Sequence, residues 1–194
     1  MTATILVTGF GPFPGAPFNP TGTLVKSLGR LVTPRGTRVI PHVFQTSYAS
    51  VDRELPALLR KYRPVALLMF GLAAQTPYLR IETRARNIHS QLADVDGVVR
   101  ATHAIAPGRT ETRPLPTLAR RLFGSARVAR VPAVISNDAG EYLCNYLCWQ
   151  AAKAARKPGG PLVAAFIHVP EGSNAAHLLR AGRAFLGTIA AACR

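Results

Sequence analysis

The sequence has few acidic residues, few cysteines and no long hydrophobic run, and each shortage excludes a class of protein. Nine Asp and Glu residues stand against 24 Lys and Arg, which gives a formal net charge of +15. The three cysteines are too few and too clustered for a disulfide scaffold. The longest apolar run, residues 64–74, is broken by Gly71 and is shorter than the roughly 18 residues that a membrane helix needs. The first ten residues have no basic segment ahead of their apolar stretch, so we expect no secretory signal and a cytoplasmic location.

What is present suits a folded core. The chain has 194 residues, of which 48% are hydrophobic and 17% charged, and this composition excludes intrinsic disorder. The length is enough for one compact domain and too short for two ordinary ones. We therefore expect a single domain over residues 1–194.

The positive surplus raises the alternative of a nucleic-acid-binding protein. Twenty of the 24 basic residues are arginines, and they are scattered along the chain. The densest stretches, residues 80–86 and 120–130, have only Tyr78 and Phe123 as aromatic platforms on which bases could stack. A solvated basic surface is the favoured interpretation, and an Arg-rich nucleic-acid binder remains the remote alternative.

Short apolar segments alternate with segments of helical periodicity along the chain. We expect strands at residues 3–10, 37–44, 65–70, 78–88, 98–105, 131–135 and 162–169. We expect helices at residues 21–31, 51–62, 116–123, 138–156 and 175–193, the second of them capped by Ser47. This alternation predicts an α/β fold with helices on both faces of a sheet.

The segment SNDAGEYLCN, residues 136–145, contains a candidate nucleophile. Asp138 and Glu141 resemble a capping box, so we expect a helix to begin near Asp138 and Cys144 to lie in its second turn. Gly140 would then clear the space in front of the sulfur, and the positive end of the helix dipole would favour the thiolate. On this segment alone, a buried and unreactive cysteine is the favoured interpretation.

Two further segments supply candidate partners for a thiol. His168 ends the buried strand in AAFIHVP, and strand ends in α/β folds open onto the ligand crevice. A histidine there is either a general base or a structural residue. In YLRIETRARN, Glu82 is a single acid between arginines on one strand face. Glu82 is either part of a charge ladder on a solvated face or the carboxylate that orients His168. The spacing alone does not distinguish these two roles.

Metal binding is a minor alternative. The cysteines and histidines that could form a zinc site do not match a familiar zinc spacing: Cys144, Cys148, His168 and His177. We expect Cys148 to be a core residue and Cys193, near the carboxyl end, to be incidental.

Four segments together resemble the pyrrolidone-carboxylate peptidases (pyroglutamyl peptidase I), cysteine peptidases that remove an amino-terminal pyroglutamyl residue. They are ILVTGFGPFPGAPFNPT, GLAAQTPYLRIE, SNDAGEYLCN and FIHVP, and their order and intervals match over nearly the whole chain. The resemblance implies Cys144 as nucleophile, His168 as base and Glu82 as orienter, acting through a thioester acyl-enzyme. It also implies a three-layer α/β/α domain with an open, mostly parallel (mixed) sheet, no metal or organic cofactor, a peptide substrate with a blocked amino terminus, and a homotetramer.

The resemblance also assigns residues to the substrate pocket. Phe10 and Phe13 match the family's ring-contacting aromatics, and Asn19 matches an asparagine that holds the loop in shape. Leu72 stands in the pocket where the family generally has a polar glutamine.

A second departure from the family concerns the oxyanion. Leu92 stands where the family generally has an arginine, and losing an oxyanion donor costs about 2–4 kcal/mol. Arg84 or Arg86 are candidate substitutes. The two departures, at Leu72 and Leu92, motivate an alternative function, namely a thiol hydrolase of the same fold with altered acyl-group specificity or a weakened site.

Overall fold

The computed structural model describes residues 3–31, 36–73 and 75–193. Within these residues the elements follow one another in the order β1 (Thr4–Phe10), α1 (Pro20–Gly29), β2 (Arg38–Phe44), α2 (Tyr48–Tyr62), β3 (Ala66–Ala73), β4 (Leu79–Glu82), β5 (Arg84–Arg86), β6 (Thr112–Pro114), α3 (Ala119–Val128), β7 (Ala133–Ser136), α4 (Leu143–Ala155), β8 (Val163–Pro170) and α5 (Ala175–Ala192). None of these helices is long and apolar enough to cross a bilayer.

Six strands form one sheet, in the order β2-β1-β3-β8-β4-β7. All neighbouring pairs are parallel except β4 and β8, which are antiparallel. Strands β5 and β6 form a separate antiparallel pair. The sheet is therefore mixed and mostly parallel, which confirms the predicted fold class.

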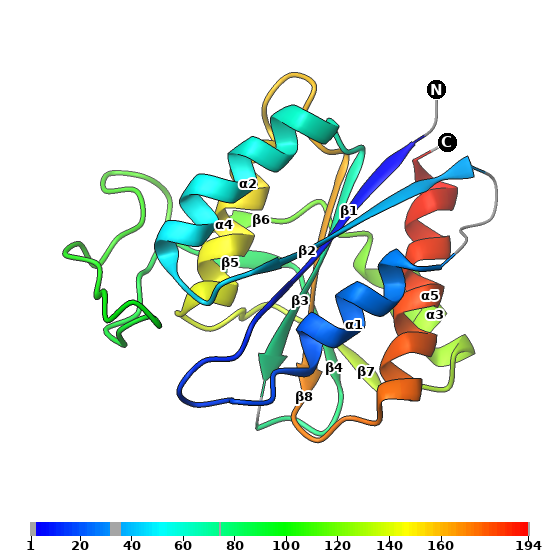
Figure 1. The fold of residues 1–194 in the computed structure, drawn as a ribbon. Helices are drawn as coiled ribbons and strands as arrows, with labels where there is room; N and C mark the ends of the chain where they lie inside the picture. The colour runs from blue at the N-terminus through cyan, green and yellow to red at the C-terminus, as the bar shows by residue number, and fades with distance from the viewer. Residues whose placement is uncertain (1–2, 32–35, 74, 194) are drawn as a thin grey trace.

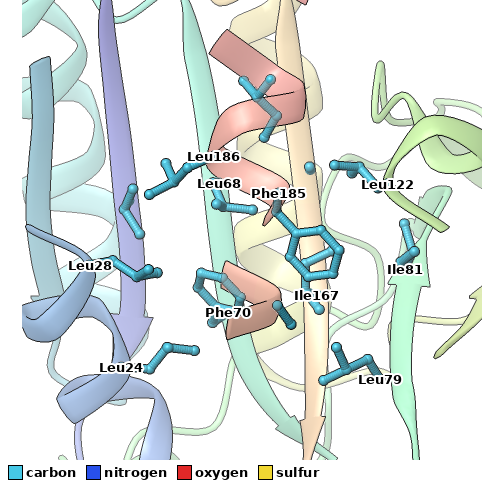
Figure 2. Packing of buried hydrophobic residues seen from close by; sticks show 14 of the residues in the cluster. Leu24, Leu28, Leu68, Phe70, Leu79, Ile81, Leu122, Ile167, Phe185 and Leu186 are labelled. Atoms are coloured by element: carbon cyan, nitrogen blue, oxygen red, sulfur yellow. The ribbon is translucent and has the colours of Figure 1, made fainter. Parts of the chain in front are cut away.

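Helices cover both faces of the sheet (Figure 1). Helices α1, α3 and α5 pack on one face, where Leu28, Phe70 and Phe185 belong to a single apolar cluster (Figure 2). Helices α2 and α4 pack on the other face, where Trp149 and Phe166 belong to a second cluster. Strands β3 and β8 lie between the two clusters, and this explains why their sequences are nearly continuous apolar runs rather than alternating ones.

Helix α2 has the predicted cap, Ser47, but begins at Tyr48 rather than at the predicted residue 51. The Ser47 side chain accepts a hydrogen bond from the Ser50 amide, as expected of an N-cap. Pro56 lies inside the helix, which ends at Tyr62 and is followed by the cap residue Arg63, whose φ of 41° is left-handed. The element is therefore present with the predicted cap despite its internal proline.

The strand predicted at residues 98–105 is wrong. Residues 87–111 form an irregular loop, held by side chains that bond its backbone instead of a sheet. The Asn87 side chain donates to the Ala106 carbonyl and accepts from the Ala106 amide, and Asp94 Oδ1 accepts from the Val98 amide at 3.0 Å. His89 Nδ1 bonds the Thr102 carbonyl at 2.8 Å. These local bonds satisfy backbone groups that a strand would have paired.

Several boundaries also differ from the prediction, and two of them bear on the candidate site. The single strand expected at residues 78–88 is divided at Thr83, because β4 joins the main sheet and β5 pairs with β6. Helix α4 begins at Leu143 rather than near Asp138. Asp138 Oδ1 accepts from the Gly140 amide, and Gly140 has a φ of 77°, so the presumed capping box is a turn that precedes the helix.

Candidate active site

The three candidate residues come from separate elements and meet over one face of the sheet. Gly71 of β3 and His168 of β8 are partners in the parallel register. A Cβ atom built on Gly71 would lie 2.6 Å from Cys144 Sγ, so the sulfur rests directly on this glycine. Cys144 is the second residue of α4, and its position in the first turn, not the second, corrects the sequence prediction.

His168 and Glu82 form a buried pair. His168 Nδ1 lies 2.8 Å from Glu82 Oε1, and Glu82 is fully buried. Glu82 lies opposite Phe166 in the antiparallel β4–β8 register, two residues from His168 on the same face. The Phe166 ring also packs edge-on against the His168 ring, with centroids 4.9 Å apart. The burial of Glu82 excludes the charge ladder on a solvated face.

The electrostatics of the site favour a protonated His168. Burial would lower the pKa of His168, but the charge and hydrogen bond of Cys144 and then those of Glu82 outweigh it, and the pKa rises to about 9. A cationic imidazole between a sulfur and a carboxylate is the arrangement of a thiolate–imidazolium pair with an orienting acid.

A pocket of about 370 Å³ opens in front of Cys144 and His168. Phe10, Phe13 and Tyr142 supply its aromatic wall, and the rings of Phe13 and Tyr142 are 6.4 Å apart. A larger hollow of about 770 Å³ lies between α2 and α4 and contains none of the candidate residues. The smaller pocket is therefore the candidate site, because it is the one that holds the reactive side chains.

Asn19 and Leu72 also line this pocket. The Asn19 side chain caps α1 by accepting from the Thr21 amide at 3.0 Å, and its Nδ2 donates to the Gly11 carbonyl at 3.1 Å. Asn19 thus joins the helix start to the loop after β1. Leu72 makes its part of the wall apolar, as the sequence predicts.

The arginines considered as oxyanion donors lie outside the pocket. Leu92 is 67% exposed in the loop of residues 87–111. Arg84 Nε donates to the Asn137 carbonyl, and Arg86 pairs with Glu141 at 3.1 Å. Neither arginine is among the residues that line the pocket.

Arg80 is the residue that sequence reasoning missed. It lines the pocket, lies opposite His168 in the β4–β8 register, and places Nε 3.2 Å from Glu82 Oε1. The signal was its alternation with Glu82, which puts both side chains on one face.

Asn145 was also missed. Its buried side chain accepts from the Arg86 amide at 2.7 Å and donates to the carbonyls of Arg86 and Ile88. These bonds tie the start of α4 to the chain that leaves β5. Its position next to Cys144 was the only available signal.

The remaining candidates lie apart from the pocket. Cys148 is fully buried one turn after Cys144, and burial raises the pKa of its thiol, which suits the core role predicted for it. Cys193 follows α5 and packs against the apolar cluster on the other face. Among the described residues, no three His, Cys, Asp or Glu side chains are grouped so that they could hold a metal ion.

Comparison with known proteins decides the family. Residues 3–177 match the family model described as pyroglutamyl peptidase. The chain belongs to the pyroglutamyl peptidase family. It is therefore an enzyme of the exo-acting cysteine peptidase class, as the sequence predicted.

Individual relatives agree with this assignment. A pyrrolidone-carboxylate peptidase of Thermococcus kodakarensis is 31% identical over 86% of this chain and 80% of its own length. One from Deinococcus radiodurans is 30% identical over 93% of this chain and 84% of its own. Among solved structures, the pyrrolidone carboxyl peptidase of Thermococcus litoralis superposes with a TM-score of 0.90 at 26% identity, covering 98% of this chain and 94% of that one.

Proposed function

We propose that the protein hydrolyses the bond after an amino-terminal pyroglutamyl residue, with Cys144, His168 and Glu82 as its catalytic triad. The observation that carries the proposal is the convergence of these three side chains at the pocket before Cys144. Family membership supports pyroglutamyl peptides as the substrate class.

The proposed chemistry has two stages. The Cys144 thiolate attacks the pyroglutamyl carbonyl carbon, and the bond to the leaving nitrogen breaks as His168 donates a proton to that nitrogen. The acyl group is then held as a thioester. His168, now neutral, takes a proton from water, the hydroxide oxygen attacks the thioester carbonyl, and the thiolate leaves. Glu82 holds Nδ1 of the imidazole throughout, so that Nε2 faces the sulfur.

The start of α4 supplies the donors that the oxyanion needs. The first amides of a helix have no partner within the helix, and no side chain caps this one. Because Cys144 is in the first turn, its own amide and that of Leu143 are among these first amides, next to the attacking sulfur in the chain. We infer that these amides stabilise the oxyanion where the family generally uses an arginine.

The aromatic wall suits a small neutral lactam. Phe10, Phe13 and Tyr142 offer apolar ring faces, and burial raises the pKa of Tyr142 to about 12, so its hydroxyl stays neutral. That hydroxyl already donates to the Ala93 carbonyl at 3.0 Å, so the lactam has to bond other polar groups of the pocket.

The test is release of a fluorophore from a pyroglutamyl amide of aminomethylcoumarin. Cys144→Ala should lose at least about 10³-fold in kcat/KM. Cys193→Ala is the matched control, because it removes a cysteine distant from the pocket, and it should retain wild-type activity. A folded wild-type protein that shows no turnover would contradict the proposal.

A second candidate function is favoured by Leu72. An apolar side chain in place of the family's glutamine leaves the pocket able to accept an acyl group other than pyroglutamyl. A panel of prolyl, acetylalanyl and pyroglutamyl amides distinguishes the two functions. If the pyroglutamyl member is inert while another is cleaved with dependence on Cys144, the second function is correct.

A further inference from the structure

The site residues lie in a fixed order across neighbouring strands of the sheet. In the register of β3, β8 and β4, the residues Gly71, His168 and Arg80 lie side by side, and Cys144 Sγ rests on Gly71. Paired residues on adjacent strands project from the same face. The aromatic residue Phe10, which lines the acyl pocket, ends β1 on the side of β3 away from β8. The order across the sheet is therefore the acyl pocket, the Cys144 sulfur, the His168 imidazole and the Arg80 guanidinium.

This order places Arg80 on the leaving-group side. His168 protonates the leaving nitrogen, so that nitrogen must lie near the imidazole and away from the acyl pocket. The next strand beyond β8 is β4, and its residue opposite His168 is Arg80. Any group that the leaving residue carries close to its nitrogen comes within reach of Arg80.

The Arg80 guanidinium is held in place. Nε lies 3.2 Å from Glu82 Oε1, and Nη2 donates to Ser136 Oγ at 3.0 Å and to the Asp138 carbonyl. None of these bonds uses Nη1, and the Arg80 side chain is 22% exposed to solvent. A fixed guanidinium whose Nη1 is unused is suited to a single charge-assisted contact with a carboxylate.

There is also room beyond Arg80. A second hollow of about 450 Å³ adjoins the catalytic pocket and shares Thr76 and Arg80 with it. Its other walls include Tyr78, Ser136 and Asn137. There is therefore space on the far side of Arg80, over strands β4 and β7, for a larger leaving residue.

The neighbouring charges do not cancel this attraction. Glu82 is fully buried below the pocket and shares one oxygen between Arg80 and His168. Glu141, the acid among the described residues that line the pocket, pairs with Arg86 at 3.1 Å. The cation that the pocket presents beside His168 is therefore Arg80.

We propose that Arg80 is a specificity-determining residue that binds a carboxylate on the leaving group, so that the preferred substrates are pyroglutamyl dipeptides with a free carboxyl terminus. The inference rests on the proposed function and adds to it the class of leaving group. The carboxylate of such a dipeptide is on the atom next to the leaving nitrogen, which is the position that faces Arg80.

The experiment compares pyroglutamyl-alanine with pyroglutamyl-alanine amide, which differ only in that charge. We expect the wild type to prefer the free acid by about tenfold in kcat/KM, the size of one charge-assisted contact. Arg80→Gln should bring the ratio close to one, and Arg80→Lys should keep part of it. Arg84→Gln is the control for loop tethering, because Arg84 bonds the carbonyl next to the one that Arg80 bonds, and it should leave the ratio unchanged.

The alternatives give different results. If Arg80→Gln slows both substrates equally and the ratio persists, Arg80 acts through Glu82 as a positioning residue and the carboxylate site is wrong. A wild-type ratio near one also overturns it. If the wild type cleaves neither substrate nor the coumarin amide, the proposed function fails, and the carboxylate site is then judged by calorimetric binding of the same pair to Cys144→Ala. Equal dissociation constants, or no binding, overturn it; tighter binding of the acid that Arg80→Gln abolishes supports it.

Discussion

At the scale of single residues, Gly71 decides where the sulfur can lie. A side chain at this position would meet both Cys144 Sγ and the Phe166 ring, each at 2.6 Å. A glycine inside a buried strand often marks such a close approach. The glycine that interrupts the apolar run of β3 is therefore explained by the Cys144 sulfur that packs against it.

Gly71→Ala should therefore displace the sulfur while the protein still folds. We expect a loss of about 1–3 kcal/mol in the free energy of unfolding from overpacking, and a fall in kcat/KM of about 100-fold or more from misplacement of the nucleophile. Urea denaturation and the coumarin assay measure the two effects. A Gly187→Ala variant, where the added methyl meets nothing within 4 Å, is the control: it should leave kcat/KM unchanged and, because Gly187 lies inside helix α5, raise stability by about 0.5–1 kcal/mol.

The protonation of His168 is a second property at this scale. In the wild type its pKa is raised to about 9, largely by the charge and hydrogen bond of Cys144 acting against burial. In Cys144→Ala those contributions disappear, so the pKa should fall by about 1 or more. Titration of the His168 imidazole by NMR in the two proteins measures this. Equal His168 titrations in the two proteins would show that the sulfur and imidazole do not interact.

At the scale of elements, sequence patterns predicted buried strands better than helix starts. The runs of β3 and β8 are apolar on both faces and are unmistakable. The start of α4 was predicted too early, because Asp138 and Glu141 have capping-box spacing but are used in a turn and an ion pair with Arg86. Such side chains have several alternative partners, and only the folded chain shows which ones they use.

The capping of α1 offers a test at this scale. Asn19→Ala removes the acceptor for the Thr21 amide and the donor to the Gly11 carbonyl, so it should cost about 1 kcal/mol of stability and raise KM. Asn19→Asp keeps the acceptor and loses the donor. We expect it to recover the stability but not the KM, as measured by thermal unfolding and steady-state kinetics. Equal KM values for Asn19→Asp and the wild type would show that the Gly11 bond does not shape the pocket.

At the scale of the whole molecule, the raised pKa of His168 links folding to pH. A group whose pKa is about 9 when folded and near 6.5 when unfolded binds its proton more tightly in the folded state. Its contribution to stability is complete below pH 6.5 and is lost as the pH rises through 9. We expect His168 to account for a decline of about 1–3 kcal/mol between these values. Urea unfolding at both pH values measures it, and His168→Asn should show a smaller decline.

Other properties of the whole molecule remain predictions. A homotetramer, a cytoplasmic location and one domain over residues 1–194 are expected from the sequence, and light scattering tests the first of them. Arginines account for most of the positive charge behind the net +15, and some of them make contacts within the protein. Arg100, for example, lies over the Tyr48 ring and pairs with Asp52. This use of arginine as a packing residue suits a basic surface better than a nucleic-acid groove.

The fold class and the convergence of Cys144, His168 and Glu82 could both be predicted, because each depends on strong signals: apolar periodicity and matched segments in register. The irregular loop of residues 87–111 could not, since side-chain bonds such as those of Asn87 and Asp94 determine it. The position of Arg80 beside His168 depends on strand order, which local sequence patterns do not contain.

That strand order has a practical consequence. A cut at Gly97, in the exposed loop, would leave β1 to β5 on one fragment and β6 to β8 on the other. In the sheet, β8 inserts between β3 and β4, so neither fragment can complete the sheet alone. Glu82 would lie on one piece, and Cys144 and His168 on the other. Under the proposed triad, two separately expressed halves fused to interacting proteins should release the coumarin fluorophore only when the fusion partners bring them together, so the chain could be used as a split reporter.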